Sequence, residues 1–182
     1  SCFIKQADVL QGLYFFEDDY DEDTLRRNFD FYEPRTVHES SLSPCIHSIL
    51  AARLGDQERA YQFYLRTARL DLDDYNNDTE DGLHITSMAG TWMSVVEGFA
   101  GMRVRDNQLR FSPFLPDSWE SFSFTINFRA HVLNVEIGHE QIIISNKSAE
   151  AITIKVFDKD YTIAAETVIY IVHKEKIVNI VA

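Results

Sequence analysis

Residues 43–56, SPCIHSILAARLGD, define one helix and the beginning of the next. Ser43 is a good N-cap and Pro44 suits the first helical position, so we expect a helix to begin here. Its apolar residues recur at helical spacing: Ile46, Ile49, Leu50 and Leu54. Gly55 ends this helix, and Asp56 can cap the one that follows. Because the connection is so short, we predict that the two helices are antiparallel.

Helical spacing extends to both sides of this stretch. Upstream, a helix is predicted over residues 23–32, ending before Pro34, and a polar loop follows. Downstream, the helix after Asp56 carries an apolar face: Tyr61, Tyr64, Leu65, Ala68 and Leu72. An acidic, turn-rich loop over residues 73–82 leads to a last helix over residues 84–100.

The last predicted helix has two faces of different chemistry. One face is apolar: Ile85, Met88, Ala89, Trp92, Val96 and Phe99. The other face is small and polar: His84, Ser87, Thr91 and Ser94. A helix with one packed face and one small, polar face can line a cavity.

The pattern changes near residue 102, where β-branched and aromatic residues begin to alternate with polar ones. Asp106-Asn107 predicts a hairpin between two short strands. The alternation of Phe122, Phe124, Ile126 and Phe128 predicts one buried strand face. Further strands are expected over residues 132–138, 141–145, 152–157, 161–164 and 167–172. The sequence thus predicts an α+β chain, with helices in residues 1–101 and an antiparallel β-sandwich in residues 102–182.

The composition excludes several classes of protein. Hydrophobic residues make up 45% of the 182 residues, enough for a packed core, while the net charge of −12 argues against binding nucleic acid. The two cysteines, Cys2 and Cys45, allow one disulfide but form no disulfide framework. No apolar run approaches the ~20 residues that span a bilayer, and there is no signal peptide, so we expect a cytoplasmic protein. The abrupt start without a methionine predicts a piece of a longer protein.

Three short stretches carry the candidate binding residues. Ser40 and Ser41 precede the start of a helix, where N–H groups and the helix dipole favour an anion, although loop or capping serines are the commoner case. His84 opens another helix and can point its ring at an anion, but a histidine here can also be a cap or a surface residue. Lys5 and Gln6 can contact a sugar or can be an exposed terminal pair.

Two neighbours of the serines, His38 and Glu39, share this ambiguity. Glu39 can act as an acid or a base, but a single loop carboxylate is usually solvated. No residue of the chain is assigned as a general acid. No zinc spacing, glycine-rich phosphate loop or Ser-His-Asp signature is present, and we expect neither a metal nor a cofactor.

Together these stretches resemble the C-terminal part of glycoside hydrolase family 65, and within it the maltose phosphorylase group. The matching motifs are KQADVL at 5–10, YEPRT at 32–36, HESSLS at 38–43, DGLH at 81–84 and GTW at 90–92. The likeness covers essentially the whole chain. By this resemblance, residues 1–101 are the last helices of an (α/α)6 catalytic barrel, and residues 102–182 are the C-terminal β domain.

The resemblance also implies an inverting phosphorolysis of an α-glucoside, giving β-glucose 1-phosphate and a sugar. Phosphate attacks the anomeric carbon in place of an activated water, while a glutamic acid protonates the leaving oxygen. That acid lies upstream of this chain in the family pattern, so we expect the isolated chain to be inactive. Ser40, Ser41 and His84 would bind phosphate, and Lys5 and Gln6 would contact the glucosyl unit.

Several alternatives stay open at this stage. Maltose is the expected disaccharide, with kojibiose or trehalose as rivals. A hydrolase of the same family is disfavoured because it has no use for a phosphate site. From another class, residues 102–182 alone could form a sugar-binding or structural module. We expect disaccharide and inorganic phosphate as partners and no nucleic acid or membrane, and a homodimer of the intact protein stays open.

Overall fold

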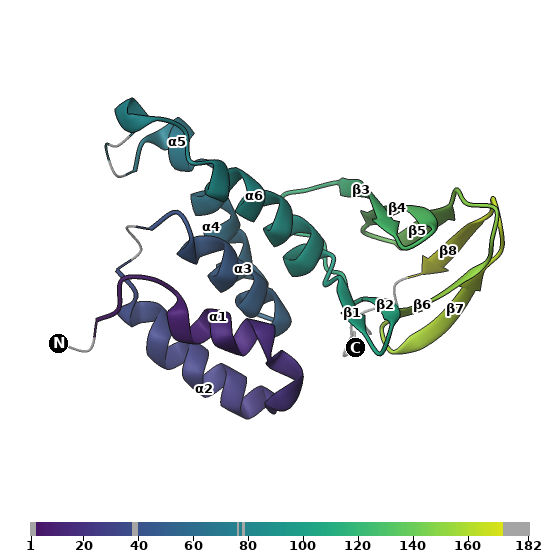
Figure 1. Cartoon of the computed structure of the whole chain (residues 1–182), viewed down its shortest axis with the longest axis horizontal. Coiled ribbons are helices and arrows are strands. Elements are labelled where there is room, and N and C mark those ends of the chain that lie inside the picture. The colour runs from purple at the N-terminus through teal and green to yellow at the C-terminus, as the bar shows by residue number, and fades with distance from the viewer. Residues whose placement is uncertain (1–2, 38–39, 76, 78, 173–182) are drawn as a thin grey trace, which may run out of the picture. The chain divides into compact units, whose positions relative to one another are not determined.

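The chain folds into two units, residues up to Met102 and residues from Arg103 onward. The structure is a computed structural model that describes residues 3–37, 40–75, 77 and 79–172. The first unit is helical and the second consists of strands (Figure 1). Among the described residues, no helix has both the length and the apolar character needed to cross a membrane.

The helical unit contains six α-helices and a π-helical turn in its described part. Their bounds are α1 Asp8–Phe15, α2 Glu22–Tyr32, α3 Ser43–Arg53, α4 Gln57–Ala68, α5 Leu70–Asp73, α6 Ile85–Met93 and the π-helical η4 Ser94–Phe99. Three short 3-10 turns accompany them: η1 Glu17–Asp19, η2 Glu33–Arg35 and η3 Thr79–Asp81.

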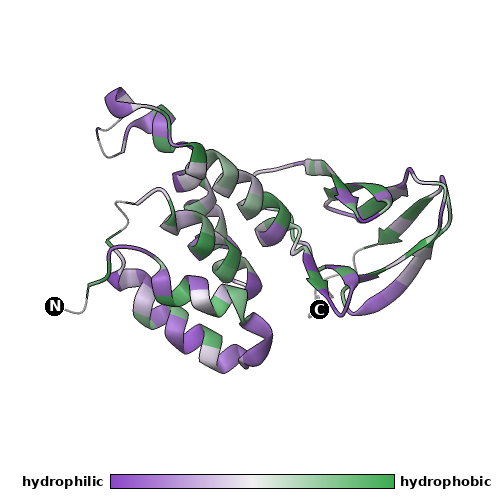
Figure 2. Cartoon of the chain, viewed as in Figure 1, coloured by the Kyte–Doolittle hydropathy of each residue, from purple (hydrophilic) through white to green (hydrophobic). Residues whose placement is uncertain are grey.

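Helix α3 lies at the centre of the helical unit. Every residue from Ser43 to Ala51 is buried, and so is Leu54, so the whole apolar stripe predicted from the sequence is buried. The ribbon of α3 is apolar along most of its length, whereas α2 is largely hydrophilic (Figure 2). Gly55 ends α3 with a φ of 77°, a left-handed conformation that favours glycine.

The antiparallel pairing of α3 and α4 is confirmed. Asp56 caps α4 by accepting a hydrogen bond from the Arg59 N–H at 3.0 Å. The Ser48 hydroxyl donates to the Ala60 carbonyl at 2.8 Å, which fastens the two helices together. The apolar face predicted for α4 was wrong. Helix α4 ends at Ala68, and Leu72 lies on the separate helix α5, where it is 77% exposed. The buried residues of α4 are Ala60, Phe63 and Thr67.

The second unit contains two four-stranded sheets with the strand orders β1-β2-β6-β7 and β3-β4-β5-β8. The strands are β1 Arg103–Arg105, β2 Gln108–Phe111, β3 Ser121–Phe128, β4 His131–Gly138, β5 Gln141–Asn146, β6 Ile152–Val156, β7 Lys159–Ile163 and β8 Val168–Val172. Asp106 and Asn107 make the predicted hairpin, both with positive φ. Phe111 and Phe124, from different sheets, lie 6.4 Å apart between ring centroids, so the two sheets are in contact there.

One strand pair departs from the prediction of purely antiparallel sheets. Strand β2 pairs with β6 in parallel, in the register Arg110–Lys155 and Phe111–Val156, while the other pairs are antiparallel. A parallel pair needs a long connection, and here β3, β4 and β5 of the other sheet lie between its two strands in the sequence. The connection expected between the strands at 152–157 and 161–164 is shifted: Phe157 and Asp158 turn with positive φ, and Lys159 already belongs to β7.

Candidate functional site

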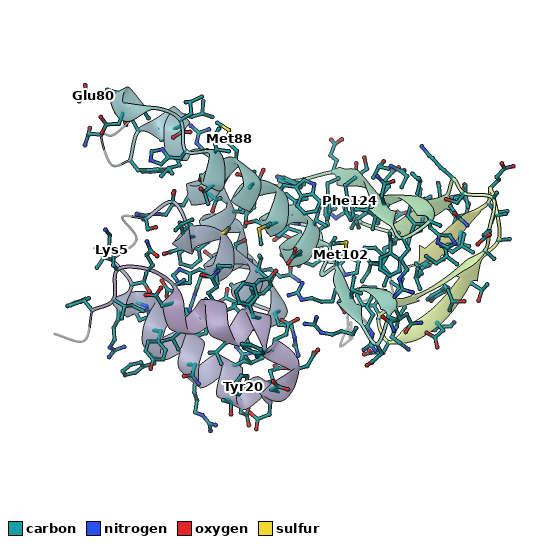
Figure 3. The ribbon with its side chains drawn as sticks, viewed as in Figure 1. Lys5, Tyr20, Glu80, Met88, Met102 and Phe124 are labelled. Carbon is teal, nitrogen blue, oxygen red and sulfur yellow. The ribbon has the colours of Figure 1, made fainter. Side chains whose placement is uncertain are left out.

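The stretch that contains Lys5 and Gln6 lies beside the end of the loop after α2. The Ile4 N–H donates to the Arg35 carbonyl at 3.0 Å, and the Val37 N–H donates to the Ile4 carbonyl at 2.9 Å. These bonds form an isolated parallel bridge between Ile4 and Thr36. Lys5 (labelled in Figure 3) is exposed and Gln6 is half-buried. The predicted sugar-contacting pair is therefore tied to a segment more than 30 residues away in the sequence.

A second contact ties the same stretch to the start of α3. The fully buried Ser43 hydroxyl accepts a hydrogen bond from the Ala7 N–H at 3.1 Å. The prediction that Ser43 caps α3 was wrong, because α3 already begins at Ser43 and Leu42 occupies the cap position without a side-chain bond. The Ser43 oxygen instead accepts a hydrogen bond from a backbone N–H that is distant in the sequence. This bond holds the stretch with Lys5 and Gln6, called the KQ stretch below, against the first turn of α3.

Ser40 and Ser41 lie just before α3, separated from it by Leu42, and both are half-buried. The Ser40 hydroxyl accepts a hydrogen bond from the Leu42 N–H at 3.2 Å, which shapes the entry to the helix. The N–H groups in the first turn of a helix have no acceptor within the helix, so this end of α3 suits an anion. His38 and Glu39 lie outside the described residues.

His84 occupies the position directly before α6, and one carboxylate holds both its backbone and its ring. The Asp71 Oδ2 atom accepts from the His84 backbone N–H at 3.0 Å, and Asp71 Oδ1 lies 2.6 Å from His84 Nδ1. This hydrogen bonding to His84 lowers the pKa of Asp71 below its usual value. Gly82, in the DGLH motif, has a φ of 127°, a conformation that side-chain-bearing residues rarely adopt.

Asp71 is the residue of this arrangement that sequence reasoning missed. It lies thirteen positions before His84, on the short helix α5, in a region rich in acidic residues. Nothing in that spacing distinguishes Asp71 from Asp73 or Asp74, so only the fold reveals the pairing with His84.

The two helix starts lie at the same end of the helical unit, because α3 runs parallel to α6 and η4. A Cβ atom added to Gly90 would lie 2.8 Å from Cys45 Cβ, and one added to Gly98 would lie 3.7 Å from Ile49 Cα. Both helices therefore advance in the same direction along their contact. The structure thus places Ser40, Ser41 and His84 at one end of the unit, and the Ala7–Ser43 bond adds the KQ stretch to it.

The small, polar residues of the last helix pack against neighbouring helices instead of lining a cavity. Ser87 and Ser94 are 2% and 0% exposed, and the Ser87 hydroxyl donates to the Thr67 carbonyl of α4 at 2.7 Å. The supposed packed face is instead open at the start of α6, where Ile85, Met88 and Trp92 are 69%, 46% and 50% exposed (Met88 is labelled in Figure 3). Small hydroxyl-bearing residues and Gly90 let α6 approach α3 and α4 closely.

The chemistry available at this end is that of anion binding. It offers two serine hydroxyls, the first-turn N–H groups of α3 and an imidazole held by a carboxylate. In the part of the chain that the structure describes, no group of three or more His, Cys, Asp or Glu side chains could hold a metal ion.

Comparison with known families assigns both units. Residues 1–93 match the model of the glycosyl hydrolase family 65 central catalytic domain. Residues 102–163 match the model of the glycosyl hydrolase family 65 C-terminal domain.

Several similar proteins are phosphorylases. The maltose phosphorylase of Bacillus subtilis (strain 168) is 54% identical over 159 residues, which cover 87% of this chain and 21% of that protein. The α,α-trehalose phosphorylase of Thermoanaerobacter brockii is 46% identical over 155 residues, 85% of this chain and 20% of that protein. A solved structure that carries the assignment of kojibiose phosphorylase, from the human microbiome, is 38% identical with a TM-score of 0.88, over 94% of this chain and 22% of that one. The chain thus spans about a fifth of the length of the relatives it matches.

Proposed function

Since this chain belongs to glycosyl hydrolase family 65, we propose that it is part of an inverting disaccharide phosphorylase and supplies that enzyme's phosphate site. The disaccharide is maltose, in line with the 54% identity to the maltose phosphorylase, and the products are β-glucose 1-phosphate and glucose. Trehalose and kojibiose are the alternative substrates, since relatives with those activities also match.

The observation that carries this proposal is the common position of the two helix starts. Ser40 and Ser41 precede α3, His84 precedes α6, and the helices run parallel, so hydroxyl, N–H and imidazole groups lie at the end of the helical unit where the proposed phosphate binds. An oxygen of the bound phosphate attacks the anomeric carbon, and the glycosidic C–O bond breaks. The leaving oxygen takes a proton from a general acid outside this chain. Lys5 and Gln6, fastened beside α3, contact the glucosyl unit.

The test is steady-state kinetics of the intact protein, with phosphate varied at saturating maltose. A charge-assisted hydrogen bond contributes about 1.5–3 kcal/mol and a neutral one about 0.5–1.5 kcal/mol. We therefore expect His84→Ala to weaken the apparent phosphate affinity more than Ser40→Ala or Ser41→Ala. The apparent affinity for maltose should change less, because phosphate is the ligand that these residues hold.

Thr86→Ala is the matched control, because Thr86 lies exposed on α6 two residues after His84. It should keep the wild-type phosphate dependence. If the three site variants also keep it, the phosphate site is refuted. Consumption of sugar without phosphate would identify a hydrolase, and parallel assays with trehalose and kojibiose decide the substrate.

A further inference from the structure

The carboxylate of Asp71 engages one residue at two points. Its Oδ2 atom bonds the backbone N–H of His84 at 3.0 Å, and its Oδ1 atom bonds ring atom Nδ1 at 2.6 Å. The first bond fixes the chain at the entry of α6, and the second fixes the plane of the imidazole. The two side chains are 15% and 24% exposed, so the pair is largely shielded from water.

Packing and pairing on α5 fix the position of the Asp71 carboxylate. Leu70, the preceding residue, is 5% exposed and anchors α5 in the core. The next acidic residue on α5, Asp73, pairs instead with Arg69, whose guanidinium Nη2 atom lies 2.6 Å from Asp73 Oδ1. Neighbouring carboxylates on one short helix therefore have separate partners, and Asp71 is the one directed at His84.

The bond to Nδ1 determines what the other ring nitrogen can present. With Nδ1–H donating to Asp71, a neutral imidazole offers only an acceptor at Nε2, which repels a phosphate oxygen. In the imidazolium form both nitrogens donate, and the carboxylate is the counter-charge of that form. The stronger, charge-assisted donor at Nε2 thus depends on a negative charge at Asp71, because an uncharged partner of the same shape allows at best the neutral Nε2–H tautomer.

We propose that Asp71 is a positioning residue for phosphate binding, which orients the His84 ring and supplies the counter-charge that makes it a two-sided donor. This inference rests on the proposed phosphorylase function. It differs from a purely structural role, because a structural Asp71 would act on the whole start of α6 and not through the imidazole.

The experiment uses the intact protein and a double-mutant cycle of Asp71→Asn and His84→Ala. The Asp71→Asn change keeps the shape of the side chain but removes its charge, so we expect the phosphate KM to rise on the order of tenfold while the maltose KM stays unchanged. In the His84→Ala background the same change should add almost nothing, since Asp71 acts through the ring. Asp73→Asn removes one charge from the same helix, and it should leave the phosphate KM at the wild-type value.

A wild-type phosphate KM in Asp71→Asn would overturn the proposal. So would a full, multiplicative effect of Asp71→Asn on top of His84→Ala. If Asp71→Asn does not fold, Asp71→Ser serves instead, because it also removes the charge: a raised phosphate KM that disappears in the His84→Ala background supports the proposal, and an unchanged one refutes it. Failure of the proposed function is visible separately, because the wild-type protein would then consume no disaccharide in a phosphate-dependent way.

Discussion

At the residue scale, Gly90 determines how closely α6 approaches its neighbours. A Cβ atom at this position would lie 2.8 Å from Cys45 Cβ, 3.0 Å from Cys45 Sγ and 3.3 Å from Thr67 Cγ2. Cys45 is on α3 and Thr67 is on α4, and both are buried. The absence of a side chain at Gly90 therefore allows three helices to meet at one point.

Gly90→Ala should destabilise the protein by about 1–3 kcal/mol, because the added methyl group overpacks this contact. The free energy of unfolding from denaturant titration measures the effect. Gly12→Ala is the control, since Gly12 lies inside α1 with nothing within 4 Å of the added Cβ. That change should stabilise by roughly 0.5–1 kcal/mol through helix propensity. If Gly90→Ala left the free energy of unfolding unchanged, the helices would be able to separate without loss of stability.

At the element scale, one buried side chain joins the end of β5 to the loops that follow β5 and β7. Asn146, at the end of β5, is 2% exposed. Its amide nitrogen donates to the carbonyls of Glu150 and Ala164 at 2.7 and 3.1 Å, and its amide oxygen accepts from the Ser148 N–H at 3.0 Å. The amide thus satisfies loop backbone groups that strand pairing leaves open.

Asn146→Asp should destabilise the second unit by at least about 2 kcal/mol, because a buried carboxylate would face carbonyl oxygens in place of a donor. Thermal or denaturant unfolding of the variant measures this loss. Asn127→Asp makes the same chemical change at an exposed position on β3 and should lie within about 0.5 kcal/mol of wild type. Equal stability of the two variants would contradict the role given to the Asn146 amide.

The elements also show what the sequence could and could not predict. The core stripe of α3, its end at Gly55 and the hairpin at Asp106-Asn107 followed from local signals, and the structure contains all three. The last helix was predicted with a single 3.6-residue period, but η4 is π-helical, so residues after Ser94 do not continue the faces of α6. The parallel β2–β6 pair was not predictable, because alternation shows which face of a strand is buried and not which strand lies beside it.

In the candidate site too, local motifs were predictable and contacts between distant segments were not. Ser40, Ser41 and His84 were identified from motifs, and the structure places them at one end of the helical unit. Asp71 could not be identified, because its contact with His84 crosses a loop and depends on where α5 ends. The structure buries Ser87 and exposes Trp92, the reverse of the faces expected from the sequence. This could not be predicted either, since it depends on the close approach of the helices at Gly90.

At the scale of the whole molecule, the folded chain holds carboxylates in their charged form. Hydrogen bonds lower the pKa of Asp21 through Thr24, of Asp71 through His84, of Asp73 through Arg69 and of Asp160 through Gln108. A carboxyl group whose pKa is lower in the folded state than in the unfolded chain adds stability above the unfolded pKa. This contribution is lost as the pH falls through the folded pKa.

The stability of the protein should therefore fall as the pH drops below about 4, the usual carboxyl pKa. Thermal unfolding midpoints measured across the acid range report this dependence. A variant that combines Asp71→Asn with Asp73→Asn should show a shallower fall, because two of the contributing groups are absent. A midpoint that stays level or rises on acidification would contradict the assigned pKa directions.

The isolated bridge between Ile4 and Thr36 has a consequence for the order in which the helical unit forms and opens. Helices α3 and α4 are joined by a few residues, so their contact closes early and at little cost in chain entropy. The bridge closes a much longer stretch of chain with only two backbone hydrogen bonds, Ile4 to Arg35 and Val37 to Ile4. Such a contact forms late and opens locally, below the free energy of global unfolding. We therefore expect the stretch around Lys5 and Gln6 to release from Arg35 and Val37 while the α3–α4 pair stays folded, and amide exchange with solvent to be faster at Ile4 and Val37 than along α3.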